Sequence, residues 1–246
     1  MARMRLVRVV LLWPAGRSNM QKLIIYGLSS PLIFRLIDAI NRHRPSIDVQ
    51  GIVLSPGDDP EIDRYGYPLL GDAAVLPDLG KQDDLFFFCN VNRSPREIQE
   101  ADAWLAENGC RTLNLVHPDI DLSHVRLGTN VFLAEGCLVG PGSVLGDHVT
   151  VRMGTIISHD VILEDRVYIS PGVCVCGTTT LREGCDIGAG VTIMPYLTIG
   201  KNTIVGAGAV VTQDLPDNVT AVGVPAKVIK THAPDDERFF GNTTNP

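Results

Sequence analysis

The chain has 246 residues, of which 45% are hydrophobic and 20% are charged, and its formal net charge is −7. This composition is that of a globular protein and excludes disorder over most of the length. Because phosphate neutralisation needs a basic surface, the negative charge argues against a nucleic-acid partner. The six cysteines form no CxxC pair, so neither a zinc site nor a dithiol redox motif is indicated.

The first nineteen residues combine a basic start with a short apolar run. Arg8 interrupts this run, which is too short to cross a membrane, and no A-x-A-like cleavage site follows. We therefore expect residues 1–19 to be an extension, either disordered or an over-long gene start. We also expect a cytoplasmic protein without a membrane partner.

Residues 20–116 alternate apolar strand patterns with helical ones. The strands are expected at 22–26, 49–54, 85–89 and 111–116, and the helices at 31–43, 72–79 and 94–108, the last with Ser94 as its cap. This alternation predicts a small parallel α/β domain. Its first strand-to-helix turn, Gly27-Leu28-Ser29-Ser30, has one glycine where the dinucleotide fingerprint has three. Nucleotide binding and a packing or oligomerisation role therefore both stay open.

From Leu127 to Val211 an aliphatic residue recurs at every sixth position. Fifteen consecutive positions are Leu, Ile or Val: Leu127, Leu133, Val139, Leu145, Val151, Ile157, Leu163, Ile169, Val175, Leu181, Ile187, Ile193, Ile199, Val205 and Val211. If these types fill about a quarter of an ordinary sequence, the odds of such a run are on the order of one in a billion. A period of six fits neither a coiled coil nor an amphipathic helix.

We interpret this period as a triangular prism. Each six residues form a short strand and a turn, three such faces close one coil, and roughly five coils stack their aliphatic residues inside. This β-helix is expected over residues 117–230, with a C-terminal tail at 231–246.

With both parts in view, the chain resembles hexapeptide-repeat sugar acetyltransferases of the sialic acid O-acetyltransferase and UDP-bacillosamine N-acetyltransferase type. The resemblance covers residues 22 to about 230, and it is carried by the motifs Gly66-Tyr67-Pro68-Leu69-Leu70-Gly71, Ile157-Ser158-His159-Asp160, Ile187-Gly188-Ala189-Gly190, Ile199-Gly200-Lys201-Asn202, Val205-Gly206-Ala207-Gly208-Ala209-Val210-Val211 and Gly223-Val224-Pro225-Ala226-Lys227. It implies a Rossmann-like substrate-binding domain at 20–116, a left-handed β-helix, acetyl-CoA as co-substrate, no metal, and a homotrimer.

The resemblance also assigns roles to individual residues. It places the catalytic base on His159 and the carboxylate that orients it on Asp160, where relatives often have Glu. His159 lies two positions after inward-facing Ile157, so its imidazole should face outward, available as a general base. A backbone N–H at a coil turn, that of Gly177, is expected to stabilise the oxyanion. Cys174 and Cys176 lack a paired base and are expected to be structural.

The resemblance further implies how the chain holds acetyl-CoA. The pantetheine arm is expected to meet backbone amides around Ala189 and Ala207, and Lys227 to approach the CoA phosphates. Tyr168 stands where some relatives use a histidine near the thioester.

The predicted function is N-acetylation of an amino sugar, carried on a nucleotide, in bacterial surface-glycan biosynthesis. One alternative is O-acetylation of a sugar or of another acceptor without a nucleotide, and another is an inactive β-helix scaffold. A β-helix carbonic anhydrase needs three metal-binding histidines, and the coil histidines His124, His148 and His159 lack that spacing. His148, beside Asp147, is expected to be solvated surface.

Overall fold

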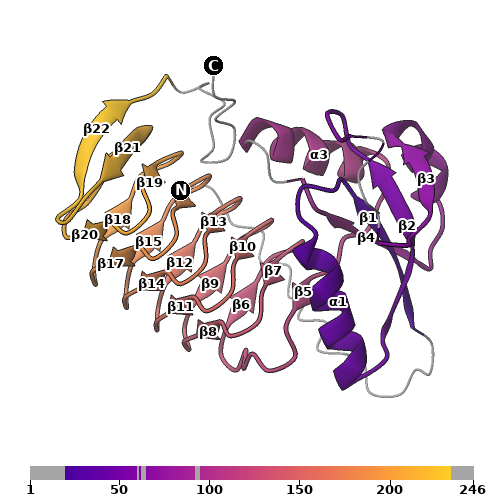
Figure 1. Ribbon diagram of the computed structural model, residues 1–246, viewed down its shortest axis with the longest axis horizontal. Helices are drawn as coiled ribbons and strands as arrows, with labels where there is room; N and C mark the ends of the chain where they lie inside the picture. Colours follow the sequence, from indigo (N-terminus) through magenta and orange to yellow (C-terminus); the bar gives the residue numbers. More distant parts are fainter. Residues whose placement is uncertain (1–19, 60, 62–64, 92–94, 234–246) are drawn as a thin grey trace. The chain divides into compact units, whose positions relative to one another are not determined.

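The computed structural model describes residues 20–59, 61, 65–91 and 95–233 (Figure 1). The chain divides into two compact units, one containing the described residues up to Pro118 and one containing those from Asp119. The expected extension at 1–19, the expected helix cap at Ser94 and most of the expected tail, 234–246, lie outside the described residues. No described helix is long and apolar enough to cross a membrane.

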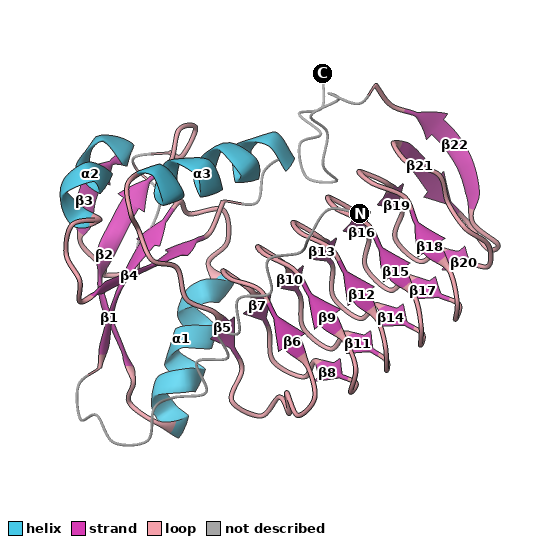
Figure 2. Ribbon diagram, turned by 180° about the vertical axis from the view of Figure 1, so that it is seen from behind, coloured by secondary structure: helices cyan, strands magenta, loops and turns pink. Residues whose placement is uncertain are grey.

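The first unit contains a parallel sheet in the order β3-β2-β1-β4. Its strands are β1 (Gln21–Tyr26), β2 (Ile47–Leu54), β3 (Leu69–Asp72) and β4 (Leu85–Cys89). The helices are α1 (Leu32–His43), α2 (Leu76–Leu79), which follows a 3-10 turn at Ala73–Val75, and α3 (Pro95–Glu107) (Figure 2). Buried Leu105 of α3 belongs to the same apolar core as Ile24 and Phe87 of the sheet. The predicted small parallel α/β domain is confirmed.

The fourth strand of this sheet is not the one that the sequence predicted. Of residues 111–116, only β5 (Leu115–Val116) is a strand, and Thr112 forms a single bridge with Phe87. The fourth strand is instead β3, which lies at the opposite edge of the sheet, beside β2, and in which no residue is buried. An edge strand with one exposed side and a glycine at position 71 lacks the apolar alternation by which a strand is recognised.

The second unit is a parallel β-helix with three faces. The first face contains β6 (Arg126–Leu127), β9 (Val144–Leu145), β12 (Ile162–Leu163), β15 (Thr180–Leu181) and β18 (Thr198–Ile199). The second face contains β7 (Phe132–Leu133), β10 (Thr150–Val151), β13 (Tyr168–Ile169), β16 (Asp186–Ile187) and β19 (Ile204–Val205), and continues into the hairpin β21 (Val219–Val222) and β22 (Lys227–Thr231). The third face contains β8 (Leu138–Val139), β11 (Ile156–Ile157), β14 (Cys174–Val175), β17 (Thr192–Ile193) and β20 (Val210–Val211).

The aliphatic residues of the six-residue period form the core of this prism. All fifteen positions except Val139 are buried, and successive coils pair in register, as Ile157 pairs with Val175. Burying one such side chain is worth about 1.5–3 kcal/mol, and the burial requires a coil above and below. The prediction of a left-handed parallel β-helix is confirmed.

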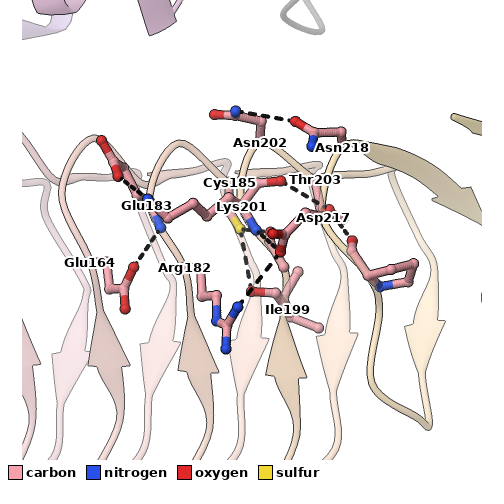
Figure 3. A network of polar contacts seen from close by, with 12 residues as sticks. Glu164, Arg182, Glu183, Cys185, Ile199, Lys201, Asn202, Thr203, Asp217 and Asn218 are labelled. Atoms are coloured by element: carbon pink, nitrogen blue, oxygen red, sulfur yellow. Dashed lines mark hydrogen bonds and ion pairs between the residues drawn. The ribbon is translucent and has the colours of Figure 1, made fainter. Parts of the chain in front are cut away.

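Polar side chains at the corners bind backbone and side-chain groups of the neighbouring coils. At the corner between the first and second faces, Thr203 donates to the Pro216 carbonyl at 2.7 Å, and Asp217 accepts the Lys201 amide at 2.8 Å (Figure 3). Glu183 bridges the neighbouring coils, because its carboxylate binds both Lys201, at 2.6 Å, and Arg166. The corners are therefore held by hydrogen bonds that run from coil to coil.

The prediction that His148 is solvated surface is wrong. Its exposed fraction is 3%, and its Nδ1 accepts a hydrogen bond from the Asn130 side-chain amide at 3.2 Å. Both residues adopt a left-handed φ of 56°, which turns their side chains alike in successive coils. The neighbouring carboxylate of Asp147 binds the Thr129 amide instead of the imidazole.

Candidate active site

His159 and Asp160 lie in the turn between β11 and β12, at the corner between the third and first faces. Backbone hydrogen bonds tie this turn to both neighbouring coils. The Asp160 amide donates to the Pro141 carbonyl at 3.0 Å, and the Thr178 amide donates to the His159 carbonyl at 3.1 Å. Asp160 adopts a left-handed φ of 55°. The period of the coil therefore fixes where the two side chains leave the backbone.

The two side chains form a hydrogen-bonded pair. His159 Nδ1 lies 2.9 Å from Asp160 Oδ2, and the side chains are 59% and 63% exposed. A carboxylate can only accept, so Nδ1 carries the hydrogen and Nε2 presents its lone pair. An imidazole in this tautomer, on an outward-facing corner, can take a proton from a nucleophile that approaches from solvent.

Gly177 lies one coil after His159 and contacts its ring. A Cβ built on Gly177 would lie 2.7 Å from His159 Nε2 and 2.8 Å from Cε1. Among the described residues, no acceptor receives the Gly177 amide hydrogen. The residue whose open side faces the atom that would take the proton thus also carries a backbone N–H without an acceptor in the described part of the chain.

Ala189 and Ala207 occupy equivalent places in successive coils, at the corner between the second and third faces. The Gly208 amide donates to the Ala189 carbonyl at 2.8 Å, which stacks the two turns. Within the described part of the chain, neither alanine amide has an acceptor. Nothing lies within 4 Å of a Cβ built on Gly190 or Gly208, so the surface of this corner is open. It offers two successive N–H groups to an extended ligand.

Lys227 is the first residue of β22 and is exposed. The turn before it is tied to the last strand of the third face, since the Val210 amide donates to the Gly223 carbonyl at 3.0 Å. The Ala226 amide donates to the Val210 carbonyl at 2.8 Å. These bonds place the hairpin next to β20, which directly follows the Ala207 turn.

Tyr168 lies apart from these residues, on β13 of the second face. The corner that carries His159 is opposite this face of the triangle. The Tyr168 hydroxyl accepts a hydrogen bond from Arg152 Nε at 2.9 Å, and the guanidinium lies 5.4 Å from the centre of the tyrosine ring. One chain therefore does not bring Tyr168 together with His159.

Apolar side chains flank the His159 corner on the outside, a feature that the sequence reading missed. The exposed fractions are 63% for Leu138, 43% for Ile156, 44% for Met194 and 78% for Tyr196. Leu138 and Ile156 occupy the outward position directly before the inward aliphatic residue. An apolar residue at this outward position was the signal that could have revealed the surface.

In the first unit, polar loops gather at the carboxyl ends of the parallel strands. After β4, the Asn90 side-chain amide donates to the Ser30 carbonyl at 3.0 Å. After β2, the Ser55 amide and hydroxyl donate to Asp58 at 2.7 and 2.9 Å. The φ of 80° at Gly27 turns the chain after β1. In open parallel sheets this edge is where ligands bind.

No protein-family model and no curated protein sequence matches the chain. Solved structures match it along most of its length. A variant of perosamine N-acetyltransferase from Caulobacter crescentus, in complex with CoA and GDP-perosamine, is 29% identical, covers 85% of this chain and 97% of its own, and superposes with a TM-score of 0.75. The acetyltransferase domain of PglB from Neisseria gonorrhoeae, in complex with acetyl coenzyme A, is 26% identical, with coverages of 86% and 100% and a TM-score of 0.72. This chain is thus similar to hexapeptide-repeat sugar acetyltransferases, as its sequence motifs indicated.

A third structure supports the fold of this acetyltransferase. WeeI from Acinetobacter baumannii is 22% identical, covers 86% of this chain and 100% of its own, and has a TM-score of 0.72. Both units take part in these matches, because the coverage extends far beyond the β-helix. The matches to the perosamine N-acetyltransferase and the PglB domain confirm the prediction of an acetyltransferase and favour it over an inactive scaffold or a carbonic anhydrase.

Proposed function

We propose that this acetyltransferase moves the acetyl group of acetyl-CoA onto the amino group of a nucleotide-linked sugar, in the cytoplasm, as a step of bacterial surface-glycan biosynthesis. The observation that carries the proposal is the His159–Asp160 pair, with the Gly177 backbone against its Nε2. Support for the substrates comes from similar proteins bound to CoA and GDP-perosamine and to acetyl-CoA.

The chemistry follows from the geometry of the pair. The amine adds to the thioester carbonyl while His159 Nε2 takes its proton, and Asp160 stabilises the resulting imidazolium. The Gly177 N–H stabilises the oxyanion. When the tetrahedral intermediate collapses, the C–S bond breaks and the CoA thiolate takes the proton from Nε2. The acetyl group never bonds to the enzyme.

The two nearby thiols are not needed in this mechanism. Burial, and after it the proximity of Cys174, raises the pKa of the Cys176 thiol above its ordinary value. A thiol with a raised pKa is mostly protonated at neutral pH, and the protonated form is a poor nucleophile. Cys176 is therefore assigned a structural role, and the mechanism does not use Cys174.

We further propose a homotrimer with acetyl-CoA between subunits. Within one chain, the third face separates the Ala189 and Ala207 amides from His159. A ligand that lies where the corner of one subunit faces that of the next would meet both kinds of corner. Its phosphates would reach Lys227. Since Tyr168 lies on the opposite side of the prism from His159, it can serve an active site only from a different subunit.

We assign to the first unit the binding of the nucleotide that carries the acceptor sugar. Its loops after β1, β2 and β4 supply backbone and side-chain hydrogen-bonding groups at the edge of the sheet where such ligands bind. O-acetylation remains the alternative, and the choice of acceptor in the assay distinguishes the two.

The test incubates the protein with acetyl-CoA and a panel of GDP-, UDP- and dTDP-linked amino sugars and follows the free thiol of CoA. We expect turnover with one of them and a loss of about 10²–10⁴-fold in His159→Ala, as for removal of a general base. The control is His124→Asn, which changes another exposed coil histidine at a φ of 63° that asparagine tolerates.

Each outcome has a defined meaning. Full turnover by His159→Ala would show that another residue is the base. Turnover only with hydroxyl or nucleotide-free acceptors would favour the alternative, O-acetylation or an acceptor without a nucleotide. A protein that binds no acetyl-CoA would be a scaffold. Light scattering tests the trimer, which has three times the 26.6 kDa mass of the chain.

A further inference from the structure

The His159–Asp160 turn rests on a three-residue segment of the preceding coil, Pro141-Gly142-Ser143. Pro141 accepts the Asp160 amide through its carbonyl at 3.0 Å. Gly142 and Ser143 each make a further contact with the same turn, and neither was singled out by the sequence motifs. Both contacts span one coil, so they exist only in the folded prism.

Gly142 leaves the space that the Asp160 carboxylate occupies. A Cβ built on Gly142 would lie 2.2 Å from Asp160 Oδ1, whereas real Cβ contacts under 3.0 Å essentially do not occur. Any side chain at position 142 would thus push the carboxylate by about 0.8 Å or more, the difference between these two values. The displaced group is the one whose other oxygen accepts from His159 Nδ1.

Glycines also make room for corner carboxylates at other positions of the turns, where the use is purely structural. Three corner carboxylates accept a backbone N–H from the preceding coil: Asp147 from Thr129 at 2.7 Å, Asp165 from Asp147 at 2.8 Å, and Asp217 from Lys201 at 2.8 Å. Glycines make room for them, since a Cβ on Gly128, Gly146 or Gly200 would lie 2.3–2.5 Å from the respective Oδ1. Asp160 differs, because within the described chain its carboxylate binds the His159 imidazole and no backbone amide.

Ser143 fixes the backbone of the turn from inside the prism. Its side chain is fully buried, and its hydroxyl donates to the Ser158 carbonyl at 2.9 Å. The same oxygen accepts the Val161 amide at 3.2 Å. These two partners stand directly before and directly after the His159–Asp160 pair, so one hydroxyl holds both ends of the turn.

We propose that Gly142 and Ser143 are positioning residues for acetyl transfer. Ser143 fixes the turn, and Gly142 lets the Asp160 carboxylate lie where it keeps the hydrogen on His159 Nδ1 and the lone pair on Nε2. Neither residue touches the reacting atoms. The inference rests on the proposed function for its kinetic consequence, while the hydrogen bond that it explains is a property of the protein alone.

The test compares Gly142→Ala with Gly154→Ala. Both glycines have a left-handed φ, 80° and 69°, so alanine introduces the same kind of backbone strain, but nothing lies within 4 Å of a Cβ at Gly154. We expect kcat to fall about ten- to hundredfold in Gly142→Ala, as for a misplacement of about 1 Å, with KM for acetyl-CoA unchanged. Gly154→Ala should stay within about twofold of the wild-type kcat.

A double-mutant cycle separates positioning from general damage. Asp160→Gly removes the carboxylate, and glycine tolerates the φ of 55° at that position. In this background Gly142→Ala has no carboxylate to displace, so we expect no further loss of kcat. An additive loss in the double variant, or an equal loss in Gly154→Ala, would overturn the proposal.

A second measurement does not depend on turnover. Proton–nitrogen correlation spectra of protein with ¹⁵N-labelled histidine report which ring nitrogen of His159 carries the hydrogen, with His159→Ala for assignment. We expect one Nδ1–H tautomer in the wild type at pH 8.5 and a mixture in Gly142→Ala. An unchanged tautomer in Gly142→Ala would refute the inference, and wild-type protein with this tautomer but without turnover would refute only the proposed function.

Discussion

Replacing Gly177 by proline removes one backbone N–H from the candidate active site and is expected to leave the coil intact. Proline already occupies this place two coils before, at Pro141, and one coil after, at Pro195. The residue before the substituted position also makes the same backbone hydrogen bond as the residue before Pro195. The Cys176 amide donates to its acceptor at 3.0 Å, as does the Met194 amide before Pro195.

The magnitude follows from comparing two substitutions at this position. Alanine and proline both add a Cβ, which would lie 2.7 Å from His159 Nε2, so both move the ring by about the same few tenths of an ångström. Only proline also removes the N–H. Loss of one oxyanion donor costs about 10²–10³ in kcat, or about 2.7–4 kcal/mol. We therefore expect Gly177→Pro to be about a hundredfold or more slower than Gly177→Ala.

The assay is the initial rate of CoA release at saturating acetyl-CoA and acceptor, with thermal melting of both variants as a check on folding. Because alanine carries the steric effect alone, the ratio of the two kcat values isolates the N–H. Equal kcat values in two variants that melt at similar temperatures would show that the oxyanion is stabilised by another donor.

Three further outcomes test the fold and the site. Ser143→Ala leaves the buried Val161 amide without its acceptor, so the free energy of unfolding should fall by about 1–3 kcal/mol and kcat should fall with it, as measured by denaturant unfolding and CoA release; an unchanged stability would contradict the described contact. Ile187→Ala removes a fully buried side chain from the middle of the stack, so a loss of about 2–5 kcal/mol is expected in the same unfolding experiment, and a loss under about 1 kcal/mol would mean that the core is not packed as described. Burial raises the pKa of the Cys185 thiol far above its ordinary value, so Cys185 should not react with an aromatic disulfide reagent at pH 8 until the protein unfolds. Peptide mapping identifies the labelled cysteines, and labelling of Cys185 in the native protein would contradict its burial.

The six-residue period was sufficient to predict the β-helix because the structure it encodes is local. Two strand residues and a turn repeat within each period, and inward and outward directions alternate along the strand, so Ile157 and Val175 could be assigned to the core from spacing alone. The same count placed His159 outward on a corner, next to Asp160 in sequence. Their hydrogen bond joins adjacent residues and needed no knowledge of distant segments.

The first unit was predictable where its strands are buried on both sides. The strand β4 was predicted with the bounds that the structure has, since its residues are apolar throughout. The edge strand β3 was missed, because its strand conformation depends on pairing with β2 and not on an apolar pattern of its own. Residues 111–116 look like a strand in sequence, yet only a single bridge at Thr112 joins them to β4.

The sequence by itself therefore determined the architecture and the corner on which the proposed catalytic pair lies, since both depend on spacing along one coil. The tertiary structure decided every contact between coils. It buried His148, placed Tyr168 on the face opposite His159, and brought Gly142 beneath the Asp160 carboxylate. Such contacts join residues eighteen positions apart, as in the bond from the Val161 amide to Ser143, and they depend on how the side chains of neighbouring coils fit together. A periodic pattern of residue types does not contain this information.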